Sequence, residues 1–144
     1  MIFVDTNVFI RYLVEPTTDA GRRHRDSATA LLSAVERGEE TITTSEVVIH
    51  EICYVLGSTL HYGLSAQDIV SYVTPILKLR GFRFPRGDKA VYLRAMEIFA
   101  EFPKLEYSDS LIAARAERLG IPLATFDKRL ARLPQLTLWQ PPIE

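Results

Sequence analysis

Short apolar runs alternate with longer amphipathic segments along the whole chain. Residues 2–4 form an apolar run that ends at Asp5, a pattern typical of a short buried strand. Runs of the same kind predict four further strands, at residues 41–43, 82–84, 122–125 and 136–138. The sequence therefore predicts about five short strands.

The segments between these runs carry apolar residues at helical spacing. One helix is predicted at about residues 22–37, with Gly38 as its terminator. Ser45 and Ser108 are expected to be N-caps, because a serine hydroxyl can accept a hydrogen bond from the first turn of a helix. The other helices follow the same periodicity, and the predicted spans are 6–13, 46–60, 66–78, 89–101 and 109–119.

Strands separated by helices imply an α/β fold with an open parallel sheet and helices on both faces. The chain contains no internal repeat, low-complexity tract or linker that would divide it, so residues 1–144 are predicted to form a single domain. In such folds ligands gather at the carboxyl ends of the strands. Candidate functional residues are therefore sought there. The Pro-rich segment from Pro141 has no functional interpretation.

Composition narrows the class of protein further. Cys53 is the single cysteine, which excludes an intramolecular disulfide and fits a reducing compartment. The first acid, at residue 5, comes too early for a signal peptide, and no apolar stretch reaches membrane-spanning length. We therefore expect a soluble, cytoplasmic protein with no membrane partner.

The charge balance bears on nucleic-acid binding. The chain has 17 basic and 18 acidic residues and a net charge of −1, whereas a module that binds nucleic acid only through phosphates is usually basic. This counts less against a nuclease, because divalent cations in an acidic site present positive charge to phosphate. The densest basic run, at residues 22–25, fits a solvated helix face better than a phosphate-binding patch.

Four carboxylates stand where the fold predicts a site. Asp5 and Asp127 follow predicted strands, although each alone is also typical of a helix cap. Glu51 shares the inward side of its helix with Val48 and Val55, so its alternatives are a functional role or a salt bridge. Asp109 also falls on an inward face, but its place in a first turn equally fits stabilisation of the helix dipole.

Together the four acids predict a metal centre. Four carboxylates at one edge of a sheet cannot all stay ionised without compensating cations. Ligation by oxygen alone favours Mg²⁺ or Mn²⁺ over Zn²⁺. One or two such ions can generate hydroxide from bound water and support displacement at phosphorus without a side-chain nucleophile.

The sequence around these acids resembles the PIN-domain family. The resemblance covers nearly the whole chain and rests on four segments in the expected order: Asp5-Thr6-Asn7-Val8-Phe9-Ile10, residues 45–52 ending Glu51-Ile52, residues 108–116 beginning Ser108-Asp109, and Ala124-Thr125-Phe126-Asp127. His50 stands where the family more often has a small residue, and Ser110 replaces a common alanine.

The resemblance implies metal-dependent RNA cleavage, with Mg²⁺ or Mn²⁺ held by Asp5, Glu51, Asp109 and Asp127. The compact length looks most like the VapC toxins of toxin–antitoxin pairs, which implies a homodimer and a cognate antitoxin. A housekeeping RNA-processing nuclease and a non-catalytic RNA- or protein-binding module are the alternatives. Asn7 and Thr125 are candidates to orient the acids or a water, or else make ordinary turn and strand-end hydrogen bonds.

Overall fold

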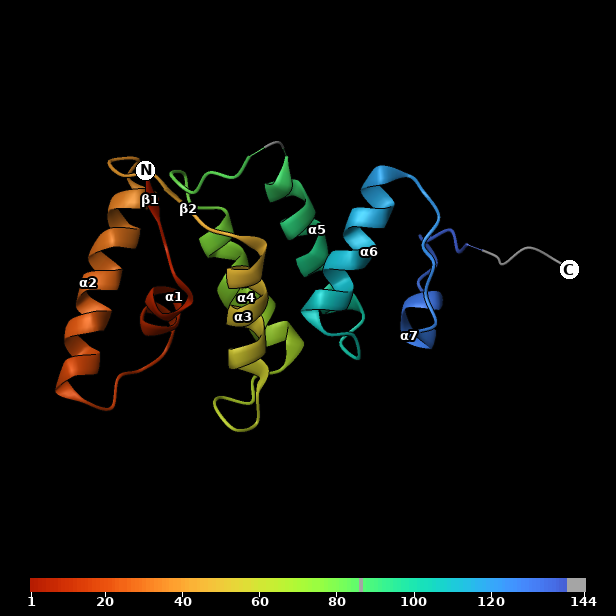
Figure 1. The fold of residues 1–144 in the computed structure, drawn as a ribbon. Coiled ribbons are helices and arrows are strands. Elements are labelled where there is room, and N and C mark those ends of the chain that lie inside the picture. Colours follow the sequence, from red (N-terminus) through yellow and green to blue (C-terminus); the bar gives the residue numbers. More distant parts are fainter. Residues whose placement is uncertain (86, 140–144) are drawn as a thin grey trace, which may run out of the picture.

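The computed structural model describes residues 1–85 and 87–139, so the Pro-rich segment from residue 141 lies outside the described residues (Figure 1). In chain order the elements are β1 (Ile2–Phe3), α1 (Thr6–Leu13), α2 (Asp19–Glu36), β2 (Ile42–Thr43), α3 (Glu46–Gly57), α4 (Ala66–Leu77), α5 (Asp88–Glu101), α6 (Tyr107–Leu119) and α7 (Lys128–Ala131). No helix in the described ranges is both long and apolar enough to span a membrane.

All strand pairing in the described part of the chain is parallel. β1 pairs with β2, with Ile2 opposite Ile42, and Ile42 forms a bridge to Phe82 on its other side. A separate parallel bridge joins Leu123 to Leu138. All five predicted strand positions therefore make parallel contacts, but only β1 and β2 extend beyond a single bridge. The predicted α/β fold with a parallel sheet is confirmed, with fewer full strands than expected.

The sheet is divided into two pieces. The piece formed by β1, β2 and Phe82 lies between α2 and the pair α3 and α4, whereas residues 121–139 lie beyond α6 at the opposite end of the molecule (Figure 1). β1 is consequently an edge strand. The prediction of a buried strand at residues 2–4 was wrong for Ile2 and Phe3, which are 40% and 63% exposed, and right for Val4. With a neighbour on one side only, β1 leaves those two side chains in solvent.

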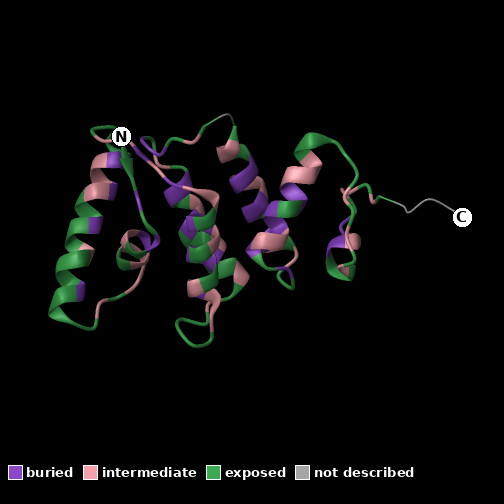
Figure 2. Ribbon diagram, viewed as in Figure 1, coloured by how far each residue is buried: buried purple, intermediate pink, exposed green. Residues whose placement is uncertain are grey.

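The hydrophobic core lies mainly on the facing sides of α3 to α6, where buried residues line the helices (Figure 2). α1 adds Phe9, which is fully buried and stacks on Phe82 with ring centroids 5.8 Å apart. A T-shaped contact between Phe84 and Tyr92 extends the aromatic packing to α5. This packing holds α1 against the short sheet and so fixes the position of the residues that follow β1.

The predicted N-cap at Ser45 and the predicted start of the helix after residue 65 are confirmed, whereas two other helix starts differ from prediction. Ser45 accepts from the backbone N–H of Val48, and Ser65 caps α4 in the same way. α2 begins at Asp19, earlier than predicted, because Thr18 supplies its cap. α6 begins at Tyr107 with Glu106 as N-cap, so the prediction that Ser108 caps this helix was wrong.

Candidate metal-binding site

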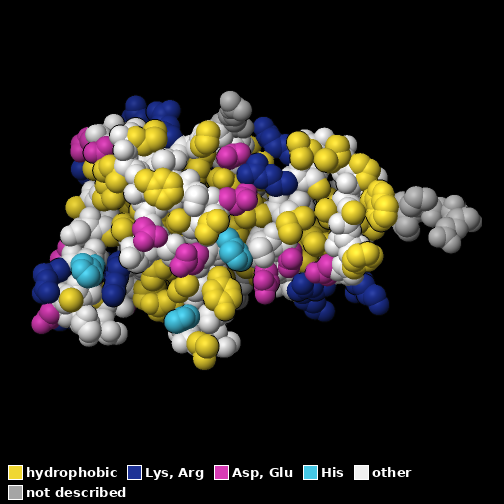
Figure 3. Space-filling model, viewed as in Figure 1, with side chains coloured by type: hydrophobic (Ala, Val, Ile, Leu, Met, Phe, Trp, Pro, Cys, Tyr) yellow, Lys and Arg dark blue, Asp and Glu magenta, His cyan; other side chains and the backbone are white. Residues whose placement is uncertain are grey.

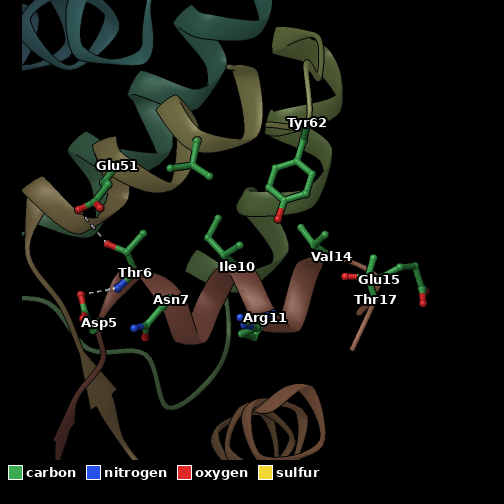
Figure 4. A pocket seen from close by; sticks show the side chains of 11 residues that line it. Asp5, Thr6, Asn7, Ile10, Arg11, Val14, Glu15, Thr17, Glu51 and Tyr62 are labelled. Carbon is green, nitrogen blue, oxygen red and sulfur yellow. Dashed lines mark hydrogen bonds between the residues drawn. The ribbon is translucent and has the colours of Figure 1, made fainter. Parts of the chain in front are cut away.

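Asp5 and Glu51 form the first pair of predicted site residues. Asp5 follows β1 and caps α1, where its Oδ1 accepts from the backbone N–H of Thr6 at 2.7 Å. The hydroxyl of Thr6 donates to Oε2 of Glu51 on α3 at 3.2 Å (Figure 4). Thr6 is only 7% exposed, so this buried residue links the two carboxylates across the junction of α1 and α3.

Both carboxylates are attached to the same end of the sheet. The N–H of Val4 donates to the carbonyl of Thr43, and the buried hydroxyl of Thr44 donates to the carbonyl of Val4 at 2.7 Å. The Ser45 cap starts α3 one residue later. The ends of β1 and β2 are therefore held together, and α1 and α3 leave this edge side by side. The rule that ligands meet the carboxyl ends of parallel strands applies to this position.

Glu51 faces a groove rather than the core. The buried residues of α3 include Ile49, Ile52 and Cys53, whereas Glu51 is exposed at the margin of this apolar stripe. The sequence prediction that Glu51 points inward was therefore wrong, because helical spacing does not distinguish the margin of a stripe from its centre. The groove has a volume of about 420 Å³ and runs along α1. It is lined by Asp5, Thr6, Asn7, Ile10, Arg11, Val14, Glu15, Thr17, Glu51, Val55 and Tyr62.

No ion pair among residues 1–85 and 87–139 includes Asp5 or Glu51. The hydrogen bonds that they accept come from Thr6, a neutral donor, and Arg11, the cation of the groove lining, makes no ion pair with either acid. Asn7, the next polar side chain on α1, is exposed and lines the same groove. The two acids are thus available to a cation that reaches the groove from solvent.

Asp109 and Asp127 form a second pair, joined by Arg129. The guanidinium of Arg129 lies 2.8 Å from Oδ2 of Asp127 and 3.4 Å from Oδ2 of Asp109. Hydrogen bonds from the Arg129 side chain and backbone hold the pKa of Asp127 below its usual range. Asp109 also accepts from the backbone N–H of Glu106 at 3.1 Å, a capping contact that the sequence did not predict, since its first-turn position indicated only stabilisation of the helix dipole. Thr125 Oγ1 accepts from the backbone N–H of Asp127 at 3.0 Å.

The structure brings the four acids together in two pairs and not in one cluster. Three or more acidic, histidine or cysteine side chains do not converge on a metal position anywhere in the described ranges. The reason is the pairing of Leu123, which contacts Leu138 instead of β1 and thereby places Asp127 beyond α6.

The first pair nevertheless fits a magnesium ion. Mg²⁺ keeps several waters and is usually bound through one or two carboxylates together with substrate phosphates. Asp5 and Glu51 supply two solvent-accessible carboxylates and no nitrogen or sulfur ligand, a donor set that suits Mg²⁺ or Mn²⁺. In the second pair the single charge of Arg129 offsets one of the two carboxylate charges, and its guanidinium occupies the space between them, so an ion would have to displace it to bind both acids.

A family model described as PIN domain matches residues 2–136. The chain belongs to the PIN domain family. PIN domains are generally metal-dependent nucleases, and the match contains all four acids together with both carboxylate pairs. No curated protein matches this PIN domain by sequence.

Two residues that contribute to the site escaped the sequence analysis. Thr6 was noted only as part of a motif, and its link to Glu51 spans 45 positions that no local pattern reveals. Arg129 stands two residues after Asp127, which is a usable signal, but its contact with Asp109 depends on the position of α7 beside α6. Neither of these two long-range contacts can be predicted from the spacing of residues in the sequence.

Proposed function

We propose that this PIN domain is a metal-dependent endoribonuclease that hydrolyses RNA phosphodiester bonds with Mg²⁺ or Mn²⁺. The observation that carries the proposal is the pair formed by Asp5 and Glu51. These carboxylates are held at the carboxyl edge of the sheet, open to solvent, and linked by buried Thr6. An unneutralised acidic pair at this edge is the arrangement expected of a cation site in a family of metal-dependent nucleases.

The residues of the chain have separate parts in this chemistry. Asp5 and Glu51 hold the ion, and Thr6 orients the Glu51 carboxylate through its hydroxyl. When bound, the ion lowers the pKa of water and neutralises developing charge on phosphate. The amide of Asn7 lies beside Asp5 and is proposed to orient that carboxylate or a water. Thr125 is proposed to hold Asp127 through the hydrogen bond to its backbone.

We further propose that the second pair of acids joins the first when a cation binds, through pairing of the free backbone groups of the two sheet pieces. The N–H groups of Ile2 and Val4 are directed at β2, so the N–H and carbonyl of Phe3 face away from it. The N–H of Leu123 donates to the carbonyl of Thr137, and its carbonyl accepts from the N–H of Trp139. The backbone groups of Ala124 therefore point away from residues 137–139. If Phe3 lay opposite Leu123 in a parallel pair, the N–H of Phe3 would donate to the carbonyl of Pro122, and the carbonyl of Phe3 would accept from the N–H of Ala124. Pro122 would act only as an acceptor, so its missing N–H does not prevent this pairing. Asp5 and Asp127 would then follow neighbouring strands.

The apolar surface supports this joining. Exposed apolar side chains gather at the end of the molecule around α6 and residues 121–139 (Figure 3); they are Ile112, Leu119, Ile121, Phe126 and Trp139. Exposed Ile2 and Phe3 lie on the edge strand that would receive this segment. Burial of such side chains favours association, each by about 1.5–3 kcal/mol when complete. A cation shared by the four carboxylates would then compete with Arg129 for Asp109 and Asp127.

The test is an RNA cleavage assay with a matched charge control. Purified protein is incubated with transfer, ribosomal and messenger RNAs in Mn²⁺ or in EDTA, beside Asp5→Asn and Glu39→Gln. Glu39 is an exposed carboxylate paired with Arg37 and does not line the groove, so its loss changes net charge equally. We expect discrete Mn²⁺-dependent cuts from the wild type and Glu39→Gln and none from folded Asp5→Asn. Undiminished cleavage by Asp5→Asn in Mn²⁺ would refute the metal assignment.

The biological role proposed for this nuclease is that of a VapC-like toxin, acting as a homodimer and silenced by an antitoxin. A PIN match over residues 2–136 is compatible with this role. Expression from a tightly controlled promoter should arrest growth, and coexpression of a small neighbouring gene product should restore it. Harmless high-level expression of an active nuclease would favour a housekeeping role in RNA processing. Failure to bind Mn²⁺ in calorimetry would favour a non-catalytic binding module.

A further inference from the structure

The groove that contains Asp5 and Glu51 continues well past them. It runs along α1, with Ile10 and Val14 on one wall and Val55 of α3 on the other. At the carboxylate end the lining is polar (Figure 4). Further along α1 the aliphatic side chains and Tyr62 form an apolar stretch, and Arg11, Glu15 and Thr17 also line the groove. The proposed metal site uses only the polar end, so the apolar part has no role in binding the ion.

Tyr62 forms part of the wall of this apolar stretch. It comes from the segment between α3 and α4, and its ring reaches across toward Ile10 and Val14. The ring is 43% exposed, so one side remains available to a ligand. An aromatic ring placed beside aliphatic side chains, at the end of a groove that begins with carboxylates, offers a stacking surface for a planar group.

The segment that carries Tyr62 is held by backbone hydrogen bonds. The N–H of Gly63 donates to the carbonyl of Ser58, and the N–H of Leu64 donates to the carbonyl of Leu56, both at 2.9 Å. Gly63 has a φ of +59°, a conformation that glycine adopts without strain. Leu64 packs against the core and anchors the turn. The ring of Tyr62 is therefore presented by a fixed turn at the end of α3.

The distance along the groove suits one nucleotide. Ile10 is five residues after Asp5, which is about 7.5 Å along the helix axis at 1.5 Å per residue. That length is comparable with the reach from a phosphate to the base of the same nucleotide. The volume of about 420 Å³ falls within the range of ligand pockets. A phosphate at the carboxylate end would thus place its base against Ile10, Val55 and Tyr62.

We infer that this groove binds the base of an unpaired ribonucleotide next to the cleaved phosphate, stacked on Tyr62. The inference rests on the proposed nuclease function, because the position of the phosphate is taken from the carboxylates. Proteins that recognise single-stranded RNA commonly stack splayed bases on aromatic side chains, and every base has a face that can stack. The site therefore selects single-stranded RNA over duplex, with tolerance for the base.

Binding without cleavage tests the inference separately from the nuclease activity. The anisotropy of a fluorescein-labelled single-stranded RNA ten nucleotides long is measured in Ca²⁺, which keeps a cation at the carboxylates, with wild type, Tyr62→Ala, Tyr62→Phe and Tyr72→Ala. A denaturing gel run after each measurement confirms that the RNA is still intact. Tyr72 is a comparably exposed tyrosine on α4 that does not line the groove. Tyr62→Ala should weaken binding by about 5- to 150-fold, the range for one base stacked on an aromatic ring. Tyr62→Phe and Tyr72→Ala should bind within about twofold of wild type.

The possible results separate the two proposals. Affinity that depends on Tyr62 in a protein that cuts no RNA would support the base site and contradict the nuclease. Cleavage by the wild type, together with unchanged affinity in folded Tyr62→Ala, would leave the nuclease intact and overturn the base site. Absence of RNA binding by the wild type would also overturn it. Thermal unfolding of each variant shows whether it folds, and Tyr62→Phe provides a readout that keeps the ring.

Discussion

Thr6 is expected to control the activity of the site through the position of Glu51. Its buried hydroxyl donates to Glu51 at 3.2 Å, while its backbone N–H donates to Asp5. The substitution Thr6→Val keeps the shape of the side chain and removes only the hydroxyl. The backbone hydrogen bond to Asp5 is unaffected, so the change isolates the orientation of Glu51.

The expected effect on stability is small and the effect on catalysis is large. A hydrogen bond of this kind contributes about 0.5–1.5 kcal/mol to the free energy of unfolding. Because Glu51 is exposed, water can replace the lost donor, and we expect a value near about 0.5 kcal/mol. Loss of a residue that orients a metal ligand typically lowers metal affinity or activity by about 10- to 100-fold. The predicted loss of activity therefore exceeds what partial unfolding could cause.

The assay compares Thr6→Val with Thr6→Ser, which retains the hydroxyl and loses the methyl group. RNA cleavage in Mn²⁺, Mn²⁺ binding by calorimetry and urea unfolding are measured for both variants and the wild type. Thr6→Ser should retain most of the activity lost in Thr6→Val. Equal losses in the two variants would show that packing matters and the hydroxyl does not. Full activity in Thr6→Val would refute the reasoning that Glu51 must be oriented by Thr6.

Three further predictions concern stability and assembly. Burial raises the pKa of the Cys53 thiol, so above the ordinary thiol pKa of about 8.5 the thiol ionises only in the unfolded chain. The free energy of unfolding should therefore fall by up to about 1.4 kcal/mol per pH unit. The same slope in Cys53→Ala over about pH 8.5–9.5 would contradict this. Gly81→Ala should lower the free energy of unfolding in urea by about 3 kcal/mol, because the new Cβ would clash with the backbone carbonyl oxygen of Glu40. As a control, Gly57→Ala should stay within about 1 kcal/mol of wild type, because its nearest neighbour is the end of the Ile69 side chain. If the two sheet pieces join when metal binds, the amide hydrogens of Phe3 and Ala124 should exchange more slowly in Mn²⁺ than in EDTA, and rapid exchange in both conditions would exclude the joining.

Local features of the fold were predicted well from sequence. The caps at Ser45 and Ser65 depend on a residue and the turn that follows it, and both helix starts were found. The start of α6 was misplaced because Ser108 was taken as the cap, although Glu106 followed three residues later by Asp109 is the acidic counterpart of a capping box. The signal for the correct helix start was therefore present in the sequence, at Glu106 and Asp109 on either side of Ser108.

Features that depend on distant partners were predicted less well. The strand predicted at residues 122–125 is present only as a single parallel bridge at Leu123, and an apolar run does not specify whether it pairs with β1 or with Leu138. The same is true of the four acids. Each was identified from its local position in the sequence, but their grouping into two pairs depends on which strand Leu123 contacts. The family match covers all four acids, and their common purpose remains a proposal.

The wide separation in sequence between β1 and its partner has a consequence for the order of folding. Ile2 pairs with Ile42, and Ile42 contacts Phe82, so each link closes a loop of about 40 residues, whereas α5 and α6 are neighbours in the chain and pack on each other. Local contacts form quickly, and parallel pairing across long loops is slow. Asp5 and Glu51 thus meet only in a late step, after β1 docks on β2. A nascent or partly unfolded chain carries the two acids as separate, inactive groups, so the proposed nuclease would appear only with the completed fold.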